Sequence, residues 1–178
     1  SVAVGKIVAK AAAEFLTPVT LELGGKNPCI IDKNCNIKLT AKRIVWGKFI
    51  NAGQTCIAPD YLLVNEEIKQ KIIDALKEEI IAAYGENPEN SKDFARIVNI
   101  KNWKRLTSFL EKETILFGGK INEVHNYIAP TLLEDSKLDS LVMQEEIFGP
   151  ILPIISFKEE SEIENIISKY EKPLSLYV

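Results

Sequence analysis

Short hydrophobic runs alternate along the chain with segments in which hydrophobic residues recur at every third or fourth position. Within 66–84, Ile68, Ile72, Leu76 and Ile80 recur every fourth residue and share one face of a predicted amphipathic helix. Spacing and composition predict further helices at 4–15, 36–52, 100–111 and 163–170. The apolar runs predict strands at 19–23, 28–31, 61–64, 114–117, 151–157 and 174–178, with 127–133 extended. This alternation favours an α/β fold with a Rossmann-like parallel sheet and helices on both faces.

Local signals mark the ends of several of these elements. Thr17-Pro18 ends the first helix, because a residue before proline avoids the helical region. Gly53 and Gly85 are predicted to end the second and third helices. Asn65 is predicted to be an N-cap, since two glutamates follow it at the positive end of the next helix.

Composition is that of a soluble globular protein: 178 residues, 46% hydrophobic and 26% charged, with a formal net charge of −3. The basic residues form no stripe of the kind that binds nucleic acid, so no such partner is expected. No apolar run reaches the roughly 20 residues that span a bilayer, and no secretory signal opens the chain. The three cysteines are odd in number and widely spaced, which favours a reducing, cytoplasmic setting.

Both ends of the chain indicate a fragment of a longer protein. The first residue, Ser1, is not methionine, and a helix is predicted to begin almost immediately after it. The predicted strand at 174–178 has nothing after it. We therefore expect a domain that is truncated at both ends.

Cys56 is the candidate nucleophile. A helix is predicted to end at Gly53 and a strand follows Pro59, so Cys56 lies on a loop between two ordered elements, a common place for chemistry. A reactive thiol and an inert, buried cysteine both remain open on this pattern. Cys29, inside an apolar strand, and Cys35, at a turn, favour structural roles.

No metal site is expected, because the cysteines form no CxxC pair and His125 is the only histidine. His125 lies in the polar stretch NEVHNY, which indicates a surface residue. No partner that would orient it as the base of a cysteine hydrolase is evident.

Two acidic positions are candidates for acid–base or binding chemistry. Glu22 lies between Leu21 and Leu23; it either faces solvent by simple alternation or is partly buried and poised as a general base. Glu145-Glu146 precede the turn IFGP, where a carboxylate could accept hydrogen bonds from ribose hydroxyls. An ordinary exposed acidic pair is the alternative there.

Three blocks of sequence support a family resemblance: LELGGKNP at 21–28, FINAGQTC at 49–56 and EEIFGPILP at 145–153. Together they resemble the aldehyde dehydrogenase superfamily, and the likeness runs from Ser1 to Val178. GQTCIAPDY at 53–61 and EKPLSLYV at 171–178 look like its class-three branch, which includes fatty aldehyde dehydrogenases. The resemblance implies oxidation of medium- or long-chain aliphatic or aromatic aldehydes to carboxylic acids, with NAD or NADP as cofactor.

The resemblance also implies a role for each matching residue. Cys56 matches the nucleophile, which forms a thiohemiacetal and then a thioester, and Glu22 matches the base that activates the hydrolytic water. Glu146 matches the carboxylate that holds the nicotinamide ribose, and Phe148 matches an aromatic residue beside the nicotinamide. Ser1 and Gly5 fall in the loop-to-helix segment beside the cofactor pyrophosphate.

The same resemblance divides the chain into two parts: 1–23, the end of a dinucleotide-binding domain, and 24–178, an incomplete catalytic domain. It implies a homodimeric parent protein, an oxyanion-binding asparagine upstream of this chain, and any membrane-anchoring tail beyond Val178. Because most of the cofactor domain is missing, the isolated chain is expected to be inactive. Two rival functions stay open: a cofactor-independent thiol esterase and an inactive, truncated subunit.

Overall fold

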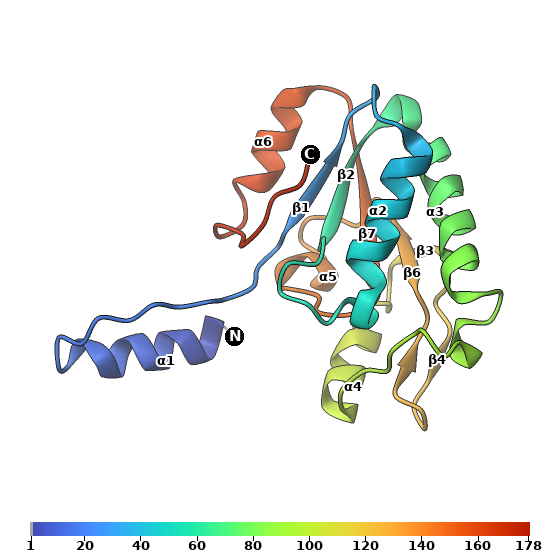
Figure 1. The fold of residues 1–178 in the computed structure, drawn as a ribbon. Coiled ribbons are helices and arrows are strands. Elements are labelled where there is room, and N and C mark those ends of the chain that lie inside the picture. Colours follow the sequence, from blue (N-terminus) through green and yellow to red (C-terminus); the bar gives the residue numbers. More distant parts are fainter. Residues whose placement is uncertain (1) are drawn as a thin grey trace.

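The computed structural model describes residues 2–178 and is built around a mixed β-sheet (Figure 1). Within that range the sheet has five strands in the order β1-β2-β7-β6-β3. Their bounds are β1 Pro28–Ile31, β2 Tyr61–Asn65, β3 Thr114–Phe117, β6 Thr131–Glu134 and β7 Ile151–Phe157. β1, β2, β7 and β6 run parallel, as predicted, whereas β3 pairs antiparallel with β6 at the edge. The predicted parallel sheet is therefore confirmed, with one antiparallel strand, β3, added at its edge.

Helices cover both faces of the sheet, which confirms the predicted layers. α2 (Ile37–Phe49) and α3 (Lys69–Tyr84) pack against each other on one face. α6 (Glu160–Ile167) follows β7 and returns toward β1 over the other face (Figure 1). A right-handed crossover demands this, because the chain moves across the sheet in the opposite direction to the β1–α2–β2 unit.

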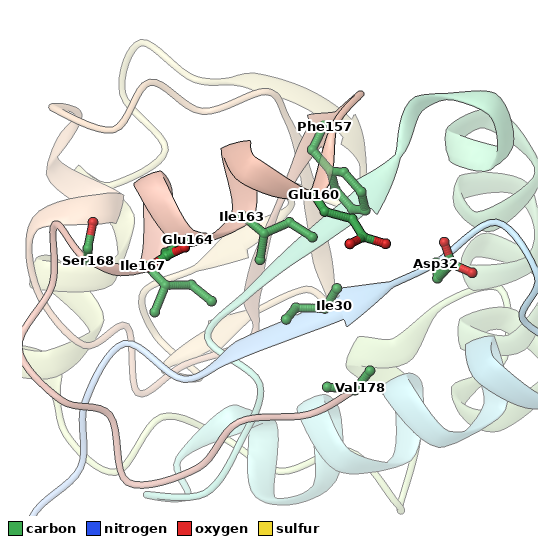
Figure 2. Close-up of a pocket in the computed structure, with 9 residues that line it drawn as sticks. All are labelled: Ile30, Asp32, Phe157, Glu160, Ile163, Glu164, Ile167, Ser168 and Val178. Carbon is green, nitrogen blue, oxygen red and sulfur yellow. The ribbon is translucent and has the colours of Figure 1, made fainter.

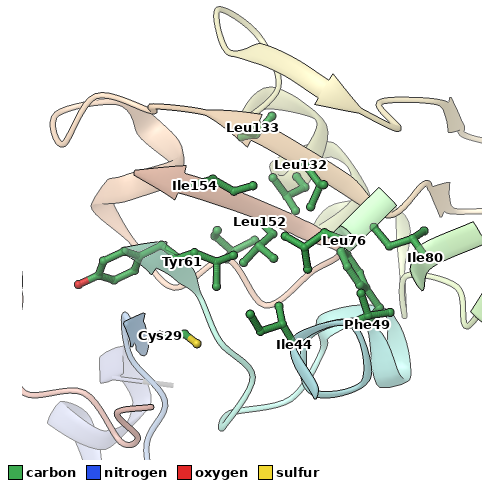
Figure 3. Close-up of a cluster of buried hydrophobic side chains, with 14 of the residues drawn as sticks. Cys29, Ile44, Phe49, Tyr61, Leu76, Ile80, Leu132, Leu133, Leu152 and Ile154 are labelled. Carbon is green, nitrogen blue, oxygen red and sulfur yellow. The ribbon is translucent and has the colours of Figure 1, made fainter. Parts of the chain in front are cut away.

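The main core lies between the sheet and the α2–α3 layer (Figure 3). Ile44 and Phe49 from α2 and Leu76 from α3 are buried against the strands. All five residues of β2 are buried, as expected for a central strand covered on both faces. The helical spacing read from the sequence therefore identified the buried faces of both helices.

Most of the smaller elements lie around the amino-terminal edge of the strands or beside β3, whereas η2 directly follows the carboxyl end of β2. They are α4 (Ile100–Ser108), α5 (Leu141–Gln144), the hairpin of β4 (Ile121–Asn122) and β5 (Tyr127–Ile128), and the 3-10 turns η1 (Ile50–Gly53), η2 (Glu66–Ile68) and η3 (Pro88–Asn90). The hairpin and α5 were not predicted, because two-residue strands and a single helical turn leave no periodic signal. The extended stretch predicted at 127–133 is divided between β5 and β6.

The amino-terminal helix α1 (Val2–Ala13) and the extended arm after it project from the body of the molecule (Figure 1). The strand predicted at 19–23 is wrong: these residues are extended, but no strand pairs with them within residues 2–178. Their apolar side chains serve another purpose, since Leu21 and Leu23 lie against Gly5 of α1. Val4, Ile7 and Phe15 are exposed.

Several element ends also differ from the sequence prediction. The helix expected to reach residue 52 ends at Phe49, because Asn51 and Ala52 adopt left-handed backbone angles, with φ of 53° and 52°. The strand expected at 174–178 is reduced to one parallel bridge between Tyr177 and Cys29. Gly85 caps α3, and the Asn65 side chain accepts a hydrogen bond from the Glu67 amide, both as predicted. Across residues 2–178 no helix has the length and hydrophobicity needed to cross a membrane.

Candidate active site

The sequence blocks singled out above meet at one edge of the sheet. Gly24 to Asn27 immediately precede β1, the Cys56 loop precedes β2, and Glu146 and Phe148 precede β7. The segments that enter parallel strands lie together at the amino-terminal edge, so the fold itself brings the blocks together. Ligands of open α/β sheets more often lie at the carboxyl-terminal edge, and this arrangement departs from that rule.

Gly24 and Gly25 fit closely against two other segments. A Cβ atom at Gly24 would lie 2.0 Å from Oε1 of Glu146, so only glycine leaves room for that carboxylate. A Cβ atom at Gly25 would lie 3.2 Å from Cα of Pro173. The arm is therefore anchored to the body at these two positions, directly after Glu22 and Leu23.

The next two residues of this block, Lys26 and Asn27, are buried and make polar contacts with other loops. Lys26 forms an ion pair with Asp60 and donates to the Val142 carbonyl at 2.7 Å. Asn27 Nδ2 donates to the carbonyl of Cys56 at 2.8 Å, and Asn27 Oδ1 accepts from the Ser175 amide at 3.0 Å. Asn27 therefore ties the Cys56 loop to the carboxyl-terminal segment.

The backbone that leads to Cys56 is held in an unusual shape. Asn51, Ala52 and Gly53 all have positive φ, and a Cβ atom at Gly53 would lie 2.2 Å from the Gly149 carbonyl oxygen. Gln54 Nε2 donates to the Arg96 carbonyl at 3.0 Å, while its Oε1 accepts from the Val98 amide at 2.9 Å. Left-handed non-glycine residues cost free energy and persist only where surrounding contacts enforce them.

The three thiols differ in exposure. Cys56 is exposed, which removes the alternative that it is a buried structural cysteine. Cys29 is buried in β1, and burial raises the pKa of its thiol to about 12, so it is inert as predicted. Cys35 is half-buried at the turn after β1. The thiol that the sequence selected is therefore the accessible one.

Glu22 lies on the extended arm and is exposed. Within residues 2–178, Glu22 therefore faces solvent, which was one of the two alternatives. It does not have the partial burial expected of a poised general base. Its position is set through Gly24, two residues further along, which rests against Glu146. The chain thus brings the Glu22 segment to the same edge of the sheet as the Cys56 loop.

Glu146 is half-buried, and desolvation and the nearby Asp60 charge raise the pKa of its carboxyl. A hydrogen bond from the Gly25 amide and the charge of Arg105 act in the opposite direction. Arg105 also holds the backbone of this turn, donating to the Glu146 carbonyl at 3.2 Å and to the Ile147 carbonyl at 2.6 Å. The carboxylate is therefore fixed by its surroundings.

Phe148 has φ of 50° and is 38% exposed, so the turn presents an aromatic side chain at the surface. A bulky residue in the left-handed region is uncommon and is held here between the buried Ile147 and Gly149. Gly5 is buried in α1 against Leu21 and Leu23. Ser1, the other residue assigned to the pyrophosphate segment, lies outside the described residues.

Sequence reasoning gave no role to Lys26, Asn27, Lys48, Asp60 or Arg105. Lys48 lies on α2 and is 0% exposed. A signal for it existed: Ala41, Ile44 and Lys48 follow the spacing of one helix face, which places a lysine on the buried side. The contacts of Asn27 and Arg105 join segments far apart in the sequence, and no local pattern reveals them.

A groove lies elsewhere, at the carboxyl-terminal edge between α6 and β1 (Figure 2). Its volume is about 540 Å³, and Ile30, Ile163, Ile167 and Val178 line it together with Asp32 and Phe157. None of the candidate residues lines this groove. It therefore has no part in the site at the opposite edge.

Metal-ligating residues do not gather in the described part of the chain, where no group of three or more His, Cys, Asp or Glu side chains is arranged to hold an ion. His125 is exposed, and its Nδ1 lies 3.0 Å from Oε1 of Glu89. This confirms the prediction of a surface histidine.

Comparison with known proteins gives consistent matches over the whole length. The model of the Aldehyde dehydrogenase family matches residues 1–178. "Aldehyde dehydrogenase family 3 member A2" of Mus musculus is 54% identical over 176 residues, covering 99% of this chain and 36% of that protein. "Aldehyde dehydrogenase, dimeric NADP-preferring" of Canis lupus familiaris is 48% identical, covering 99% of this chain and 39% of that protein.

Solved structures give the same result. The substrate-bound state of Staphylococcus aureus AldH superposes with a TM-score of 0.95 at 52% identity, covering 98% of this chain and 38% of that one. Mycobacterium tuberculosis aldehyde dehydrogenase complexed with NAD+ superposes with a TM-score of 0.82 at 30% identity, covering 93% and 36%. The chain thus spans less than two fifths of the length of these relatives.

Proposed function

Because this chain belongs to the aldehyde dehydrogenase family, we propose that the whole protein oxidises aldehydes to carboxylic acids with NAD or NADP. The observation that supports this best is the convergence of three segments at one edge of the sheet. Gly24 contacts Glu146, Lys26 pairs with Asp60, and Asn27 binds the Cys56 carbonyl. The three blocks that carry the resemblance are thereby joined through successive residues of one segment.

In this proposal Cys56 is the nucleophile. Its thiolate attacks the aldehyde carbon and forms a C–S bond, and the carbonyl electron pair moves to oxygen. The Cys56 amide suits stabilisation of that oxyanion, because among residues 2–178 it donates no hydrogen bond to another residue. Loss of hydride from the thiohemiacetal carbon re-forms the carbonyl as a thioester.

Glu22 is proposed to complete the cycle as a general base. It removes a proton from water, the resulting hydroxide attacks the thioester, and the Cys56 thiolate leaves as the carboxylic acid forms. Exposure of Glu22 in the described chain is consistent with access to water. The anchor at Gly24 holds it at the edge of the sheet where the thiol lies.

The residues present fit the nicotinamide-ribose end of a dinucleotide. Glu146 offers a fixed, half-buried carboxylate, which has room because Gly24 carries no Cβ atom. Two residues further on, Phe148 offers an exposed aromatic surface. A carboxylate of this kind accepts hydrogen bonds from two vicinal hydroxyls. When bound, the dinucleotide supplies the hydride acceptor.

We further propose the domain division and the biological setting that the resemblance implies. Residues 1–23 belong to a dinucleotide-binding domain, and 24–178 belong to the catalytic domain. The substrates are medium- or long-chain aliphatic or aromatic aldehydes, and the protein is a homodimer. The name of the dog relative describes that protein as dimeric. A cytoplasmic location is consistent with three free cysteines.

The test uses the full-length protein with NAD or NADP and a series of aldehydes of increasing chain length. We expect reduction of the cofactor that depends on aldehyde and that is abolished in Cys56→Ser. Ester hydrolysis without any dependence on cofactor would favour the thiol esterase instead. A full-length protein that binds neither cofactor nor a thiol-directed electrophile at Cys56 would favour the inactive subunit.

A further inference from the structure

Arg105 on α4 binds the backbone of the Glu146 turn, a contact that the proposed reaction leaves unexplained. Its Nη1 donates to the Glu146 carbonyl at 3.2 Å, and its Nη2 donates to the Ile147 carbonyl at 2.6 Å. A guanidinium presents its N–H groups in a rigid fork, so one side chain can hold two successive carbonyls in a fixed relation. The guanidinium is itself restrained by the Phe109 ring, whose centroid lies 5.1 Å from its Cζ.

These two carbonyls depend on Arg105 alone. Neither accepts a second hydrogen bond from any group within residues 2–178. Ile147 is 0% exposed, so its carbonyl is shielded from water, and a shielded carbonyl without a donor is costly. The ion pair with Glu145 explains Arg105 less well, because that glutamate side chain is 57% exposed and such pairs contribute little.

The peptide group that follows Glu146 is also held at its other end. Its N–H, which belongs to Ile147, donates to Oδ1 of Asp60 at 2.9 Å. Asp60 is in turn fixed by its ion pair with Lys26, in which the two side chains are 5% and 4% exposed. One peptide group is thus held at its carbonyl by a cation from α4 and at its N–H by a carboxylate from the segment before β2.

The orientation of this peptide group decides where the Glu146 carboxylate lies. The peptide begins at the Glu146 Cα atom, so a tilt of its plane redirects the side chain. The place of that side chain is narrow, because Oε1 lies 2.0 Å from the position that a Cβ atom at Gly24 would take. Asp60 alone would leave the peptide free to tilt about a single hydrogen bond, whereas Arg105 adds the second point that fixes its plane.

We propose that Arg105 is a positioning residue for the cofactor. Together with Asp60 it fixes the peptide between Glu146 and Ile147, and thereby directs the Glu146 carboxylate at the nicotinamide ribose. This inference rests on the proposed role of Glu146. A displaced carboxylate accepts hydrogen bonds from the two ribose hydroxyls at poorer distances and angles, so the loss of Arg105 weakens cofactor binding without removing any reacting group.

The test measures the dissociation constant of NADH or NADPH by fluorescence in the full-length protein. Arg105→Met should weaken binding about tenfold, the scale of one charge-assisted hydrogen bond. Arg105→Lys should lie between Arg105→Met and the unmodified protein, because an ammonium keeps the charge but not the fork. Lys104→Met, which removes only an exposed pair with Glu123, is the control and should bind normally.

Three further results separate this role from a merely structural one. The affinity for ADP, which lacks the nicotinamide ribose and is measured by displacement of NADH or NADPH, should not change in Arg105→Met. The rate at which iodoacetamide alkylates Cys56 without cofactor should also stay the same. In the Glu146→Gln background, Arg105→Met should have no additional effect on cofactor affinity, because both act through the same side chain.

Melting temperatures identify the Arg105 variants that fold. Unchanged cofactor affinity in every Arg105 variant that folds, an equal loss of affinity for ADP, or additive effects of Arg105→Met and Glu146→Gln would each overturn the role of Arg105 alone. If Glu146→Gln itself leaves cofactor binding unchanged, the assignment of Glu146 in the proposed function fails, and the inference fails with it.

Discussion

The loop around Cys56 and the arm around Glu22 are held by the chain in different ways. The thiol loop is tied by Asn27 and Gln54 to three other segments, and its backbone shape is enforced by contact with Gly149. In the arm, the backbone of 18–24 makes no hydrogen bond to any other part of residues 2–178. The position of Glu22 depends on the anchor at Gly24 and Gly25.

This difference indicates which of the two proposed catalytic groups is positioned by residues 24–178 themselves. The Cys56 loop is held by contacts within 24–178, which include one partly buried and one buried hydrogen bond from Asn27. The Glu22 carboxylate lies on an exposed segment, and its position is set by the contacts of Gly24 and Gly25. Substitutions in the two regions should therefore affect different steps of the reaction, and the predictions below proceed from the largest expected effect to the smallest.

The largest effect is expected from Cys56→Ser, which removes the thiolate while preserving the loop. Aldehyde-dependent reduction of cofactor should fall at least about ten-thousandfold, because no other group can form the thioester. Steady-state absorbance of the reduced cofactor measures this loss. Cys35→Ser is the matched control, and an equal loss there would mean that the nucleophile has been misassigned.

Glu22→Gln should reduce kcat about a thousandfold, the usual scale of a general base. Because only hydrolysis is impaired, a rapid burst of reduced cofactor should precede the slow steady state. Stopped-flow absorbance resolves the two phases. Glu14→Gln, also exposed and near the start of the arm, should behave as the unmodified protein. Loss of the burst together with the steady state would place Glu22 before thioester formation instead.

Asn27→Ala should loosen the thiol loop without removing any reacting group. The carbonyls of Cys56 and Ala58 and the amide of Ser175 would lose their partner. A displacement of the sulfur by about 1 Å would reduce kcat about a hundredfold, with a loss of about 2 kcal/mol in stability. Initial rates and thermal unfolding give the two quantities. Asn34→Ala, at an exposed turn, is the control, and a normal burst rate in Asn27→Ala would contradict the anchoring role.

Gly24→Ala tests the anchor of the arm. The new methyl group would displace the Glu146 carboxylate from its position without a collision with backbone, so folding should be retained while cofactor binding suffers. We expect the cofactor KM to rise about tenfold. Gly47→Ala is the control, because a Cβ atom there meets only ordinary contacts with Pro59. A change in kcat with unchanged cofactor KM would show that the glycine acts on Glu22 rather than on Glu146.

The last prediction concerns stability beneath the thiol loop and involves no change in activity. Burial lowers the pKa of Lys48 from 10.5 to about 8. Between these values the unfolded chain binds more protons than the folded one, so stability should rise with pH across this window, by at most about 3 kcal/mol. Lys48→Met should lack this rise. The melting temperatures of the unmodified protein and of Lys48→Met are compared at about pH 7.5 and 9.5. Equal changes in the two melting temperatures would contradict the contribution of Lys48.

The elements that could be predicted from the sequence are those with a local pattern of hydrophobic residues. Helical spacing located α2 and α3, because burial of one helix face imposes a period, and continuous apolar runs located β1, β2 and β7, which lie within a sheet covered on both faces. The same reasoning failed at 19–23, where leucines that suggested a strand contact Gly5 of α1 instead. The antiparallel direction of β3 also escaped it, since strand direction depends on how the chain returns and not on the composition of the strand.

The candidate site could be predicted only in part, because many of its contacts join segments far apart in the sequence. The roles of Cys56, Glu22 and Glu146 were predicted through the family resemblance, because local pattern alone left each of them undecided. Asn27, Asp60 and Arg105 were missed because their partners lie in distant segments. Lys48 could have been found, since its spacing from Ile44 places a charge on a buried helix face.

The central claim is that the thiol of Cys56 and the carboxylate of Glu22 serve one active site in successive steps. The most direct measurement is mass spectrometry of peptides from full-length Glu22→Gln protein incubated with a long-chain aldehyde and NAD or NADP. The account predicts an acyl group on the peptide that contains Cys56, formed only when the cofactor is present. An unmodified Cys56 peptide, or acylation of Cys35 in its place, would contradict it.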